Sequence, residues 1–320
     1  MGLKRKNVLV TGGTGFIGSH LVQALAKDNQ VYVVDLVINP HSYYNQQGLN
    51  SQVVFEHCDV ADFRTIHSVI VKNHIDFVFH LAAQAIVDTA YNEPLETITS
   101  NVMGTANILE SCRQYGRVEG ILVTSTDKAY GKLPRVDETK PISGDHPYEV
   151  SKSSADLIAR SYFTTYKLPV VVTRFGNVYG EGDLNLNRII PGIMEAVVKN
   201  QTLQIRSNGK YIRDYVYVKD VVDASLVLAK NINKTKGEAF NISSLQNLSV
   251  IEVVRKVESI LKVKIPYKIQ SSTKNEIPVQ SVNFAKMRKT FNWKPQNNFT
   301  TTIAGIYDWY QNYLTASRVH

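Results

Sequence analysis

Short apolar runs recur along the first half of the chain, and longer segments with helical spacing of apolar residues separate them. Each run is too short for a typical helix and has the composition of a strand that is buried on both faces. The segments 95–115 and 148–166 show the three- and four-residue spacing of amphipathic helices. This alternation predicts an α/β fold with a doubly wound parallel sheet covered by helices on both faces. The predicted strands are 7–11, 31–34, 52–60, 76–84, 120–126 and 168–180.

The first 35 residues contain strand, glycine-rich turn, helix, strand and acidic residue, in that order. In "NVLVTGGTGFIGSHL", Gly12 permits a tight turn, Gly15 lets a pyrophosphate approach the backbone, and Gly18 lets the helix pack closely on the strand. The helix N-terminus presents N–H groups and a positive dipole end to phosphates. Asp35 lies where a carboxylate accepts hydrogen bonds from an adenosine ribose, and it favours NAD because it would repel the 2′-phosphate of NADP. The complete order predicts a Rossmann-type dinucleotide site.

Other residues of this region are candidates for contact with the cofactor. Asp59 follows the third predicted strand and has two interpretations, contact with the adenine edge or an N-cap for the next helix. Capping preferences leave both interpretations open. The full set of predicted cofactor residues is Gly12, Thr14, Gly15, Phe16, Ile17, Gly18, Asp35, Asp59, Val60, Leu81, Ala82, Ala83, Asn101, Tyr148 and Lys152.

Beyond Gly180 the alternation of strands and helices becomes irregular, which predicts a second, smaller domain. We therefore expect an NAD-binding Rossmann domain at 1–176 and a mainly substrate-binding domain at 177–320. A later segment, roughly 212–243, is expected to return to the first domain. The aromatic residues near the end of the chain, Tyr307, Trp309 and Tyr310, lie in a helical pattern and are expected to pack rather than react.

Composition narrows the function classes further. The chain has 36 basic and 28 acidic residues, and the basic ones are scattered rather than gathered in one arm. We therefore expect no nucleic-acid partner and instead a ligand that carries phosphates.

No apolar stretch is long enough for a membrane helix, and the patch after the basic start is too short for a signal peptide. Two cysteines, Cys58 and Cys112, have no metal-ligand spacing, so we expect no metal and a reducing, cytoplasmic location.

The stretch "STDKAYG", residues 125–131, places a hydroxyl, a carboxylate and an ammonium group directly after a buried strand. Ligands of such sheets bind at the carboxyl ends of the strands. Tyr148 and Lys152 follow, four residues apart and therefore on one helix face. A phenol ordinarily has a pKa near 10, and a neighbouring ammonium stabilises its phenolate, so this pair provides a base near neutral pH. The alternative for Asp127 and Lys128 is a solvated turn with an ion pair.

Together with this pair, the motifs "TGGTGFIG", "HLAAQ", "NVMGTANILE", "RFGNVYG" and "RDYVYVKD" resemble the extended short-chain dehydrogenase/reductases that act on nucleotide sugars. The resemblance covers nearly the whole chain. It implies that Tyr148 takes the proton of the sugar 4-hydroxyl while NAD takes hydride from C4. It also implies that Lys152 tunes Tyr148 and holds the nicotinamide ribose, and that Thr126 binds the 4-oxygen. These proteins commonly form dimers through the helices that correspond to 95–115 and 148–166, although burial against the sheet would explain the apolar positions of those helices equally well.

Within that family, the triplet Thr126-Asp127-Lys128 resembles that of CDP-glucose 4,6-dehydratases. dTDP-glucose 4,6-dehydratases carry an acidic residue where Lys128 stands, whereas UDP-N-acetylglucosamine 4,6-dehydratases share a similar "STDKA". The resemblance implies that Asp127, as a neutral acid, protonates the departing C6 hydroxyl. Lys128 occupies the place of the C5 base, but a lysine with a pKa near 10 is protonated at neutral pH, so we favour electrostatic stabilisation of the enolate.

The distal half is expected to hold the nucleotide. In relatives the Arg of "RDYVYVKD" contacts the substrate diphosphate, which points to Arg213, and a guanidinium suits bidentate binding. A surface salt bridge with Asp214 is the competing explanation. Asn177 matches the family's phosphate-proximal Asn. The full set of predicted substrate residues is Gln84, Ser125, Asn177, Arg188 and Arg213.

The leading hypothesis is an NAD-dependent hydro-lyase that converts CDP-glucose to CDP-4-keto-6-deoxyglucose. A UDP-N-acetylglucosamine 4,6-dehydratase is the nearest variant of this function. A UDP- or CDP-hexose 4-epimerase is the main rival, and Asp127 and Lys128 argue against it because C4 epimerisation requires no water loss. A catalytically silent NAD-binding regulatory protein is the alternative outside enzymes, and the intact Tyr148–Lys152 pair argues against it.

Overall fold

The computed structural model describes residues 3–244, 246–271 and 277–316. The chain divides into two compact units, each formed by several segments. The first unit comprises Met1–Gly131, Glu138–Arg174 and Val222–Asn241, and the second comprises Lys132–Asp137, Phe175–Val221 and Ile242–His320. The segment that returns to the first unit therefore begins at Val222 rather than near 212, because the strand before it pairs with strands of the second unit.

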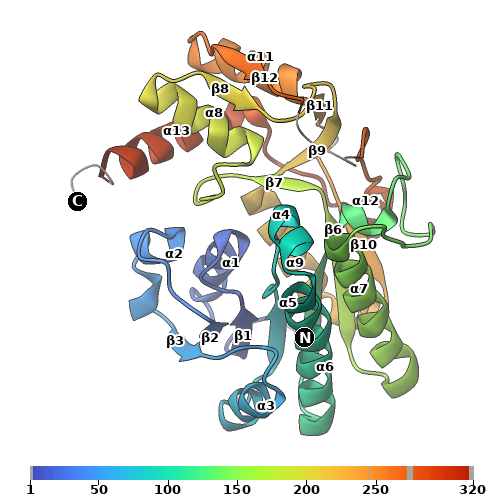
Figure 1. Ribbon diagram of the computed structural model, residues 1–320. Coiled ribbons are helices and arrows are strands. Elements are labelled where there is room, and N and C mark those ends of the chain that lie inside the picture. The colour runs from blue at the N-terminus through green and yellow to red at the C-terminus, as the bar shows by residue number, and fades with distance from the viewer. Residues whose placement is uncertain (1–2, 245, 272–276, 317–320) are drawn as a thin grey trace. The chain divides into compact units, whose positions relative to one another are not determined.

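A seven-stranded sheet forms the centre of the first unit in the described part of the chain, with the order β10-β6-β5-β4-β1-β2-β3 (Figure 1). The pairs that join β3, β2, β1, β4 and β5 are parallel. The chain reverses its direction of travel across the sheet after β3, as in a doubly wound fold. The strands are β1 (Asn7–Thr11), β2 (Gln30–Asp35), β3 (Val54–His57), β4 (Phe77–His80), β5 (Gly120–Thr126), β6 (Val170–Phe175) and β10 (Ala239–Ile242).

Both faces of this sheet are buried. Successive strand residues point to opposite faces, and Leu9 and Val34 belong to one hydrophobic core while their neighbours Val10 and Val33 are also fully buried. Side chains of α3 (Phe63–Lys72), α6 (Gly104–Tyr115) and α7 (Pro147–Tyr166) complete the core that contains Leu9 and Val34. The helices α6 and α7 run side by side (Figure 1). The predicted doubly wound α/β fold is therefore confirmed.

The helices of the first unit begin and end where local chemistry favours it. Asp62 caps α3 by accepting hydrogen bonds from the backbone N–H groups of Arg64 and Thr65, at 3.0 and 3.3 Å. Pro147 opens α7, where a missing N–H costs nothing. The helices are α1 (Phe16–Leu25), α2 (Tyr43–Gln46), η1 (Leu49–Ser51), α3 (Phe63–Lys72), α4 (Val87–Asn92), α5 (Pro94–Ile98), η2 (Thr99–Met103), α6 (Gly104–Tyr115), η3 (Asp127–Tyr130), α7 (Pro147–Tyr166), α9 (Val218–Lys230, which spans the boundary between the units) and α10 (Ile232–Thr235).

The second unit contains two small sheets among its described residues, with the orders β11-β9-β7 and β12-β8. A capping box between Ser249 and Glu252 starts α11. Tyr310 is fully buried, as expected for a packing residue, while Tyr307 and Trp309 are half-buried. The elements are β7 (Asn177–Tyr179), α8 (Ile189–Lys199), β8 (Leu203–Ile205), β9 (Ile212–Tyr217), β11 (Asn247–Ser249), α11 (Val250–Leu261), β12 (Tyr267–Ile269), α12 (Ala285–Phe291) and α13 (Phe299–Ala316).

Two predicted elements are each divided in the structure, and the strands predicted at 52–60 and 76–84 are shorter, as β3 and β4. The helix expected over 95–115 is divided into α5, a π-helical turn at η2, and α6. The strand expected over 168–180 is divided between β6 in the central sheet and β7 in the second unit. No helix in the described parts of the chain has the length and apolar character needed to cross a membrane.

Candidate active site

The glycine-rich turn lies between β1 and α1 and is tightly packed. Gly12 has a φ of +69°, and a Cβ there would lie 2.8 Å from the backbone nitrogen of Ala82. A Cβ on Gly18 would lie 2.1 Å from the carbonyl oxygen of Gly12, so the start of α1 approaches the turn as closely as glycine alone permits. Gly15 is exposed, and a Cβ there would meet only the Gly12 carbonyl oxygen, at 3.3 Å. The surface beside Gly15 is therefore open to a ligand.

Asp35 ends β2 beside this turn. Its Oδ2 atom accepts hydrogen bonds from the Thr14 hydroxyl at 2.6 Å and the Thr14 backbone N–H at 3.2 Å. The backbone N–H of Leu36 donates to Oδ1 at 2.9 Å. The carboxylate is thus fixed in orientation and is only half-buried. A carboxylate has about four lone-pair sites, so it retains acceptor capacity for a ribose.

The other predicted cofactor residues of this half lie in different surroundings. Asp59 is exposed, and its side chain accepts from the backbone N–H of Ala61, while Asp62 is the residue that caps α3. The capping interpretation of Asp59 is therefore wrong. Val60 is buried in the hydrophobic core. The 81–83 segment follows β4, where the Leu81 backbone N–H donates to the Thr11 carbonyl at 3.1 Å. Phe16 and Ile17 are half-buried in the first turn of α1.

Asn101 lies on the π-helical turn η2 and links three segments. Its amide oxygen accepts from the Gln84 backbone N–H at 2.7 Å, and its amide nitrogen donates to the Gln84 carbonyl at 3.0 Å and to Ser151 Oγ at 2.9 Å. The Gln84 side chain accepts a hydrogen bond from the Ile86 backbone N–H at 2.5 Å. π-Helical turns are frequent at functional sites. Here the turn aims a buried amide at α7 and at the loop after β4.

The carboxyl end of β5 gathers the predicted reacting groups. Ser125, Thr126 and Asp127 are buried, which is inconsistent with a solvated turn. The Thr126 hydroxyl donates to Asp127 Oδ1 at 3.1 Å and accepts from the Lys128 backbone N–H at 3.3 Å, so it caps η3. Ser125 Oγ is buried without a hydrogen-bond partner among the described residues. A buried hydroxyl in that state is suited to receive a polar ligand atom.

The tyrosine and the two lysines converge on this strand end. Lys152 is buried on α7, and its Nζ atom donates to the Thr124 carbonyl at 2.6 Å. Burial lowers the pKa of Lys152 from 10.5 to about 8, while the carboxylate of Asp156 acts in the opposite direction. The Lys128 Nζ atom lies 5.7 Å from the centre of the Tyr148 ring, within the range of a cation–π contact. The sequence analysis assigned these groups to one site, and the structure places Lys128 beside Tyr148 and Lys152 against the end of β5.

His80 completes the polar surroundings of Lys152 at the end of β4. Its two ring nitrogens lie 2.8 Å from Thr11 Oγ1 and 3.0 Å from Thr105 Oγ1. Burial, with a smaller effect of Lys152, lowers the pKa of His80 to about 3. The imidazole is therefore neutral at neutral pH and adds no positive charge beside Lys152.

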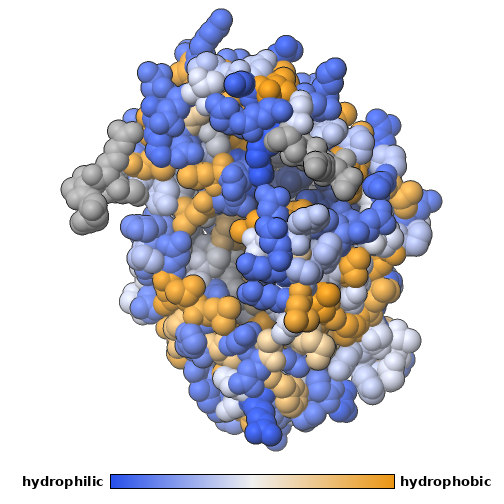
Figure 2. Space-filling view, in the orientation of Figure 1, coloured by the Kyte–Doolittle hydropathy of each residue, from blue (hydrophilic) through white to orange (hydrophobic). Residues whose placement is uncertain are grey.

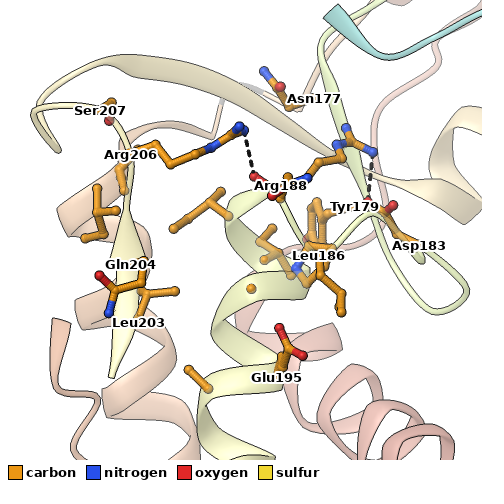
Figure 3. A pocket seen from close by; sticks show the side chains of 18 of the residues that line it. Asn177, Tyr179, Asp183, Leu186, Arg188, Glu195, Leu203, Gln204, Arg206 and Ser207 are labelled. Carbon is orange, nitrogen blue, oxygen red and sulfur yellow. Dashed lines mark hydrogen bonds and ion pairs between the residues drawn. The ribbon is translucent and has the colours of Figure 1, made fainter. Parts of the chain in front are cut away.

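A pocket of about 490 Å³ lies within the second unit, in the size range of small-molecule sites. The predicted substrate residues Asn177, Arg188 and Arg213 all line it, from the start of β7, the N-cap of α8 and β9. Figure 3 shows Arg188 held by Asp183, with 2.8 Å between Nη1 and Oδ2. Apolar side chains such as Leu186, Ile205 and Val250 form much of the remaining wall.

Arg213 is buried in β9. Its Nη1 atom donates to the carbonyl oxygens of Ile212 at 2.9 Å and Ile277 at 2.7 Å, and the guanidinium carbon lies 5.6 Å from the centre of the Tyr211 ring. Burial of 93% of its surface does not fit the surface salt bridge that was the competing explanation. Backbone acceptors and an aromatic face instead fix a positive charge in the wall of the pocket.

Sequence reasoning missed several pocket residues. Asp183 and Arg206 both line the pocket, and Arg206 Nη2 donates to the Asn187 carbonyl at 3.2 Å. Arg206 lies just after β8, where alternating buried and exposed positions in "LQIRS" were the available signal for an outward-facing side chain. Asp183 lies in the loop after β7, and no local pattern marks it. Within the described residues, no group of His, Cys, Asp and Glu side chains is arranged to hold a metal ion.

Known proteins resemble this chain over almost its whole length. The family model described as GDP-mannose 4,6 dehydratase matches residues 9–306. A dTDP-glucose 4,6-dehydratase from Haemophilus influenzae is 30% identical over 95% of this chain and 97% of its own length. A human dTDP-D-glucose 4,6-dehydratase is 32% identical over 80% of this chain and 74% of its own length.

Solved structures agree with the fold but span two activities. A dTDP-glucose 4,6-dehydratase from Bacillus anthracis in complex with NAD has a TM-score of 0.84 and 27% identity, covering 96% of this chain and 97% of that chain. A UDP-glucose 4-epimerase from Thermotoga maritima with UDP-glucose has a TM-score of 0.87 and 28% identity, covering 96% and 99%. The expected kinship with nucleotide-sugar 4,6-dehydratases is confirmed by the family match, and this chain belongs to the GDP-mannose 4,6 dehydratase family.

Proposed function

We propose that this protein is an NAD-dependent nucleotide-sugar 4,6-dehydratase, a hydro-lyase, and that it converts CDP-glucose to CDP-4-keto-6-deoxyglucose. The observation that carries this proposal is the buried end of β5. There Asp127 and Lys128 adjoin Thr126, and the Lys128 ammonium lies 5.7 Å from the Tyr148 ring centre. Oxidation and return at C4 would require only the hydroxyl, the phenol and Lys152. The additional acid and cation suit the removal of water.

The residues around the glycine-rich turn fit NAD. The open surface beside Gly15 would receive the pyrophosphate at the N-terminus of α1, which has no acidic residue in its first turn. The Asp35 carboxylate would accept hydrogen bonds from the adenosine ribose, and Lys152 would hold the nicotinamide ribose. When bound, NAD supplies the oxidant for C4 and, once reduced, the reductant for C6.

Three residues would prepare C4 for oxidation. Tyr148 would take the proton of the 4-hydroxyl, because the buried Lys152 ammonium stabilises a nearby phenolate. Thr126 would bind the 4-oxygen and keep it oriented. Ser125 Oγ, which is buried without a partner in the described structure, would supply a second hydrogen bond to the sugar.

Two further residues would drive the loss of water. A ketone at C4 acidifies the C5 proton, which would pass to solvent water, and Lys128 would stabilise the enolate that remains. Asp127 would give its proton to the C6 hydroxyl, which departs as water. Two protons leave the sugar, from O4 and C5, and two are supplied, one to the departing hydroxyl and one to C5 after reduction at C6.

The pocket of the second unit would hold the nucleotide. Arg188, Arg206 and Arg213 line it and would pair with the diphosphate, while the apolar wall would accept the base and ribose. The charge distribution supports this assignment, because the second unit contains 19 of the 36 basic residues and 10 of the 28 acidic ones. The positive excess of the whole chain therefore belongs to this unit. The preference for cytidine rests on the Thr126-Asp127-Lys128 triplet.

A panel of CDP-, dTDP-, UDP- and GDP-hexoses, including UDP-N-acetylglucosamine, tests the proposal by mass spectrometry of the products. Loss of one water from CDP-glucose at the highest kcat/KM is the expected result. Faster dehydration of a dTDP- or UDP-sugar would contradict the choice of nucleotide but keep the reaction. An unchanged mass with an inverted C4 centre would establish the 4-epimerase function that the Thermotoga maritima structure favours. No turnover of any sugar would favour a silent NAD-binding protein.

We also propose that the protein is a homodimer built on α5, η2 and α7. Leu95, Ile98 and Met103 are exposed on the first two segments, and Val150 and Leu157 are exposed seven residues apart on α7. Figure 2 shows hydrophobic residues gathered where α5 and α7 lie in Figure 1. These side chains are therefore not explained by burial against the sheet. Sedimentation equilibrium should give a dimer that Leu157→Lys dissociates, and a monomeric wild type would contradict the proposal.

A further inference from the structure

A fully buried arginine lies on β6, where an apolar residue would be expected. The Arg174 side chain is 1% exposed, and it forms two hydrogen bonds with the Asp156 carboxylate on α7. Nε donates to Oδ2 at 2.7 Å and Nη2 donates to Oδ1 at 2.8 Å. Asp156 itself is completely buried, and Arg160 adds a longer contact of 3.2 Å to Oδ1. The ion pair is therefore bidentate and shielded from water.

Tyr130 extends this pair to two more elements. Its hydroxyl accepts a hydrogen bond from Arg174 Nη1 at 2.7 Å and donates one to Asn241 Oδ1 at 2.8 Å. The guanidinium carbon also lies 4.9 Å from the centre of the Tyr130 ring. The Asn241 backbone N–H in turn donates to Glu138 Oε1 at 2.7 Å. Four buried side chains thus connect α7, β6, η3 and β10, and the strands β5, β6 and β10 are neighbours in the sheet.

The connected elements are those that carry the proposed reacting groups. Tyr130 is the last residue of the single turn η3, which begins with Asp127 and Lys128. Asp156 lies four residues after Lys152, on the same side of α7. A shift of the Tyr130 ring would therefore move the Asp127–Lys128 turn relative to the Lys152 ammonium. Gly131, with a φ of +62°, ends the turn directly after Tyr130 and leaves no room for a side chain, since a Cβ would lie 2.7 Å from Ser143 Oγ.

Core stability alone does not account for this arrangement. A buried ion pair often contributes no more to stability than apolar residues of the same volume would, because both charges lose their hydration. It does impose directional contacts, since the guanidinium must meet the carboxylate and the phenol at fixed angles. Geometry is therefore the property that this network adds to the sheet.

We propose that Arg174, Asp156 and Tyr130 form a positioning network that holds the Asp127–Lys128 turn in register with Lys152, so that water loss follows C4 oxidation. The inference rests on the proposed dehydratase function. None of the three residues is assigned a contact with substrate or cofactor. Their effect is on the placement of groups that make such contacts.

Tyr130→Phe tests this network with minimal change, because it removes only the hydroxyl and keeps the ring beside Arg174. The rates of nicotinamide reduction and of water loss are measured separately in single turnovers with CDP-glucose. We expect water loss to slow about ten- to a hundredfold while C4 oxidation changes less than about threefold, so that reduced nicotinamide accumulates. Tyr162→Phe is the matched control, since it also removes only a tyrosine hydroxyl, one on α7 that donates to Glu110 on α6 and lies outside the network. It should leave both rates unchanged.

Equal slowing of both steps in Tyr130→Phe, or no slowing of either, would overturn the positioning role. If Tyr130→Phe does not fold, the same split is measured in Arg174→Lys, because lysine keeps the charge but cannot meet Asp156 and Tyr130 simultaneously. A wild type that dehydrates no sugar refutes the proposed function instead. Hydrogen exchange then tests whether the network holds the Asp127–Lys128 turn in place. Faster exchange at the Lys128 and Gly131 amides in Tyr130→Phe, with exchange in α7 unchanged, would support the positioning role. Unchanged exchange at those two amides would overturn it.

Discussion

The end of β5 and the pocket of the second unit both contain charged side chains, but they are built in different ways. At β5, Thr126 caps η3 and Lys152 of α7 donates to the Thr124 carbonyl of β5, so hydrogen bonds to regular elements fix both groups. The pocket is lined by residues that range from Asn177 to Gln270, including β7, α8, β8 and β9 and the loops between them. Rigid strand and helix ends suit chemistry, whereas a wall drawn from many segments suits recognition of a large ligand.

This difference predicts which substitutions affect the reaction and which affect binding. Tyr148→Phe should have the largest effect, because it removes the proposed proton acceptor for the 4-hydroxyl. We expect kcat to fall about a thousandfold with KM nearly unchanged. Single-turnover absorbance of reduced nicotinamide is the measurement. Tyr162→Phe on the same helix should retain wild-type kcat, and a Tyr148→Phe enzyme with more than a tenth of that kcat would contradict the assignment.

Asp127→Asn should divide the chemistry at the β5 end into its two stages. The amide keeps the shape of the side chain but has no proton to give to the C6 hydroxyl. We expect C4 oxidation at nearly the wild-type rate and water loss slowed about a hundredfold. Mass spectrometry of quenched reactions should detect the 4-keto sugar that retains its C6 hydroxyl.

The control for this substitution is Asp28→Asn, which removes an exposed carboxylate paired with Lys4. It should dehydrate as the wild type does. Wild-type water loss by Asp127→Asn would refute the acid role. Equal loss of oxidation would show instead that Asp127 organises the whole strand end, as its hydrogen bond with Thr126 permits.

The contrast between features fixed locally and features fixed by distant segments also explains which secondary-structure elements the sequence predicted. The strands 7–11 and 120–126 were predicted with the bounds that β1 and β5 have, because each is an apolar run with polar or turn residues at its ends. The π-helical turn at Thr99–Met103 was missed. No glycine or proline lies between the start of α5 at Pro94 and this turn, and Asn101 is held by contacts with Gln84 and Ser151, which are distant in sequence.

Residues of the candidate site were likewise predicted where a local sequence pattern marks them and missed where only long-range contacts do. The residues at the β5 end lie within 30 positions of one another, where helical spacing and strand ends reveal them. Arg174 and Tyr130 were not identified, because a buried polar network has no local pattern and depends on partners 18 to 111 residues apart. In the pocket, Arg213 was predicted from a motif. Asp183 was missed because its role is to hold the Arg188 side chain, and that contact exists only in the folded structure.

Arg213→Lys should affect binding and leave chemistry intact. Lysine keeps the charge but cannot donate to the Ile277 carbonyl and to a diphosphate with a planar fork. We expect KM for the nucleotide sugar to rise about ten- to thirtyfold with kcat within about twofold. Arg255→Lys, on an exposed position of α11, is the matched control and should leave KM unchanged. A fall in kcat with unchanged KM would assign Arg213 to the chemistry instead of the pocket.

The smallest expected effect is a pH dependence that belongs to the β5 end alone. Burial lowers the pKa of Lys152 to about 8, so the ammonium that supports Tyr148 is lost as pH rises above that value. We expect C4 oxidation to slow about threefold between roughly pH 7.5 and 8.5, with KM unaffected.

Unfolding would not cause this loss of activity, because the effect of Lys152 on the free energy of unfolding changes with pH in the opposite direction. The unfolded chain binds the Lys152 proton more tightly, with a pKa of 10.5, so the stability that depends on Lys152 rises between about 8 and 10.5. Denaturant titrations of the wild type and of Lys152→Met across this range should show the wild type gaining relative stability while it loses activity. A parallel fall of both would contradict the buried lysine as the source.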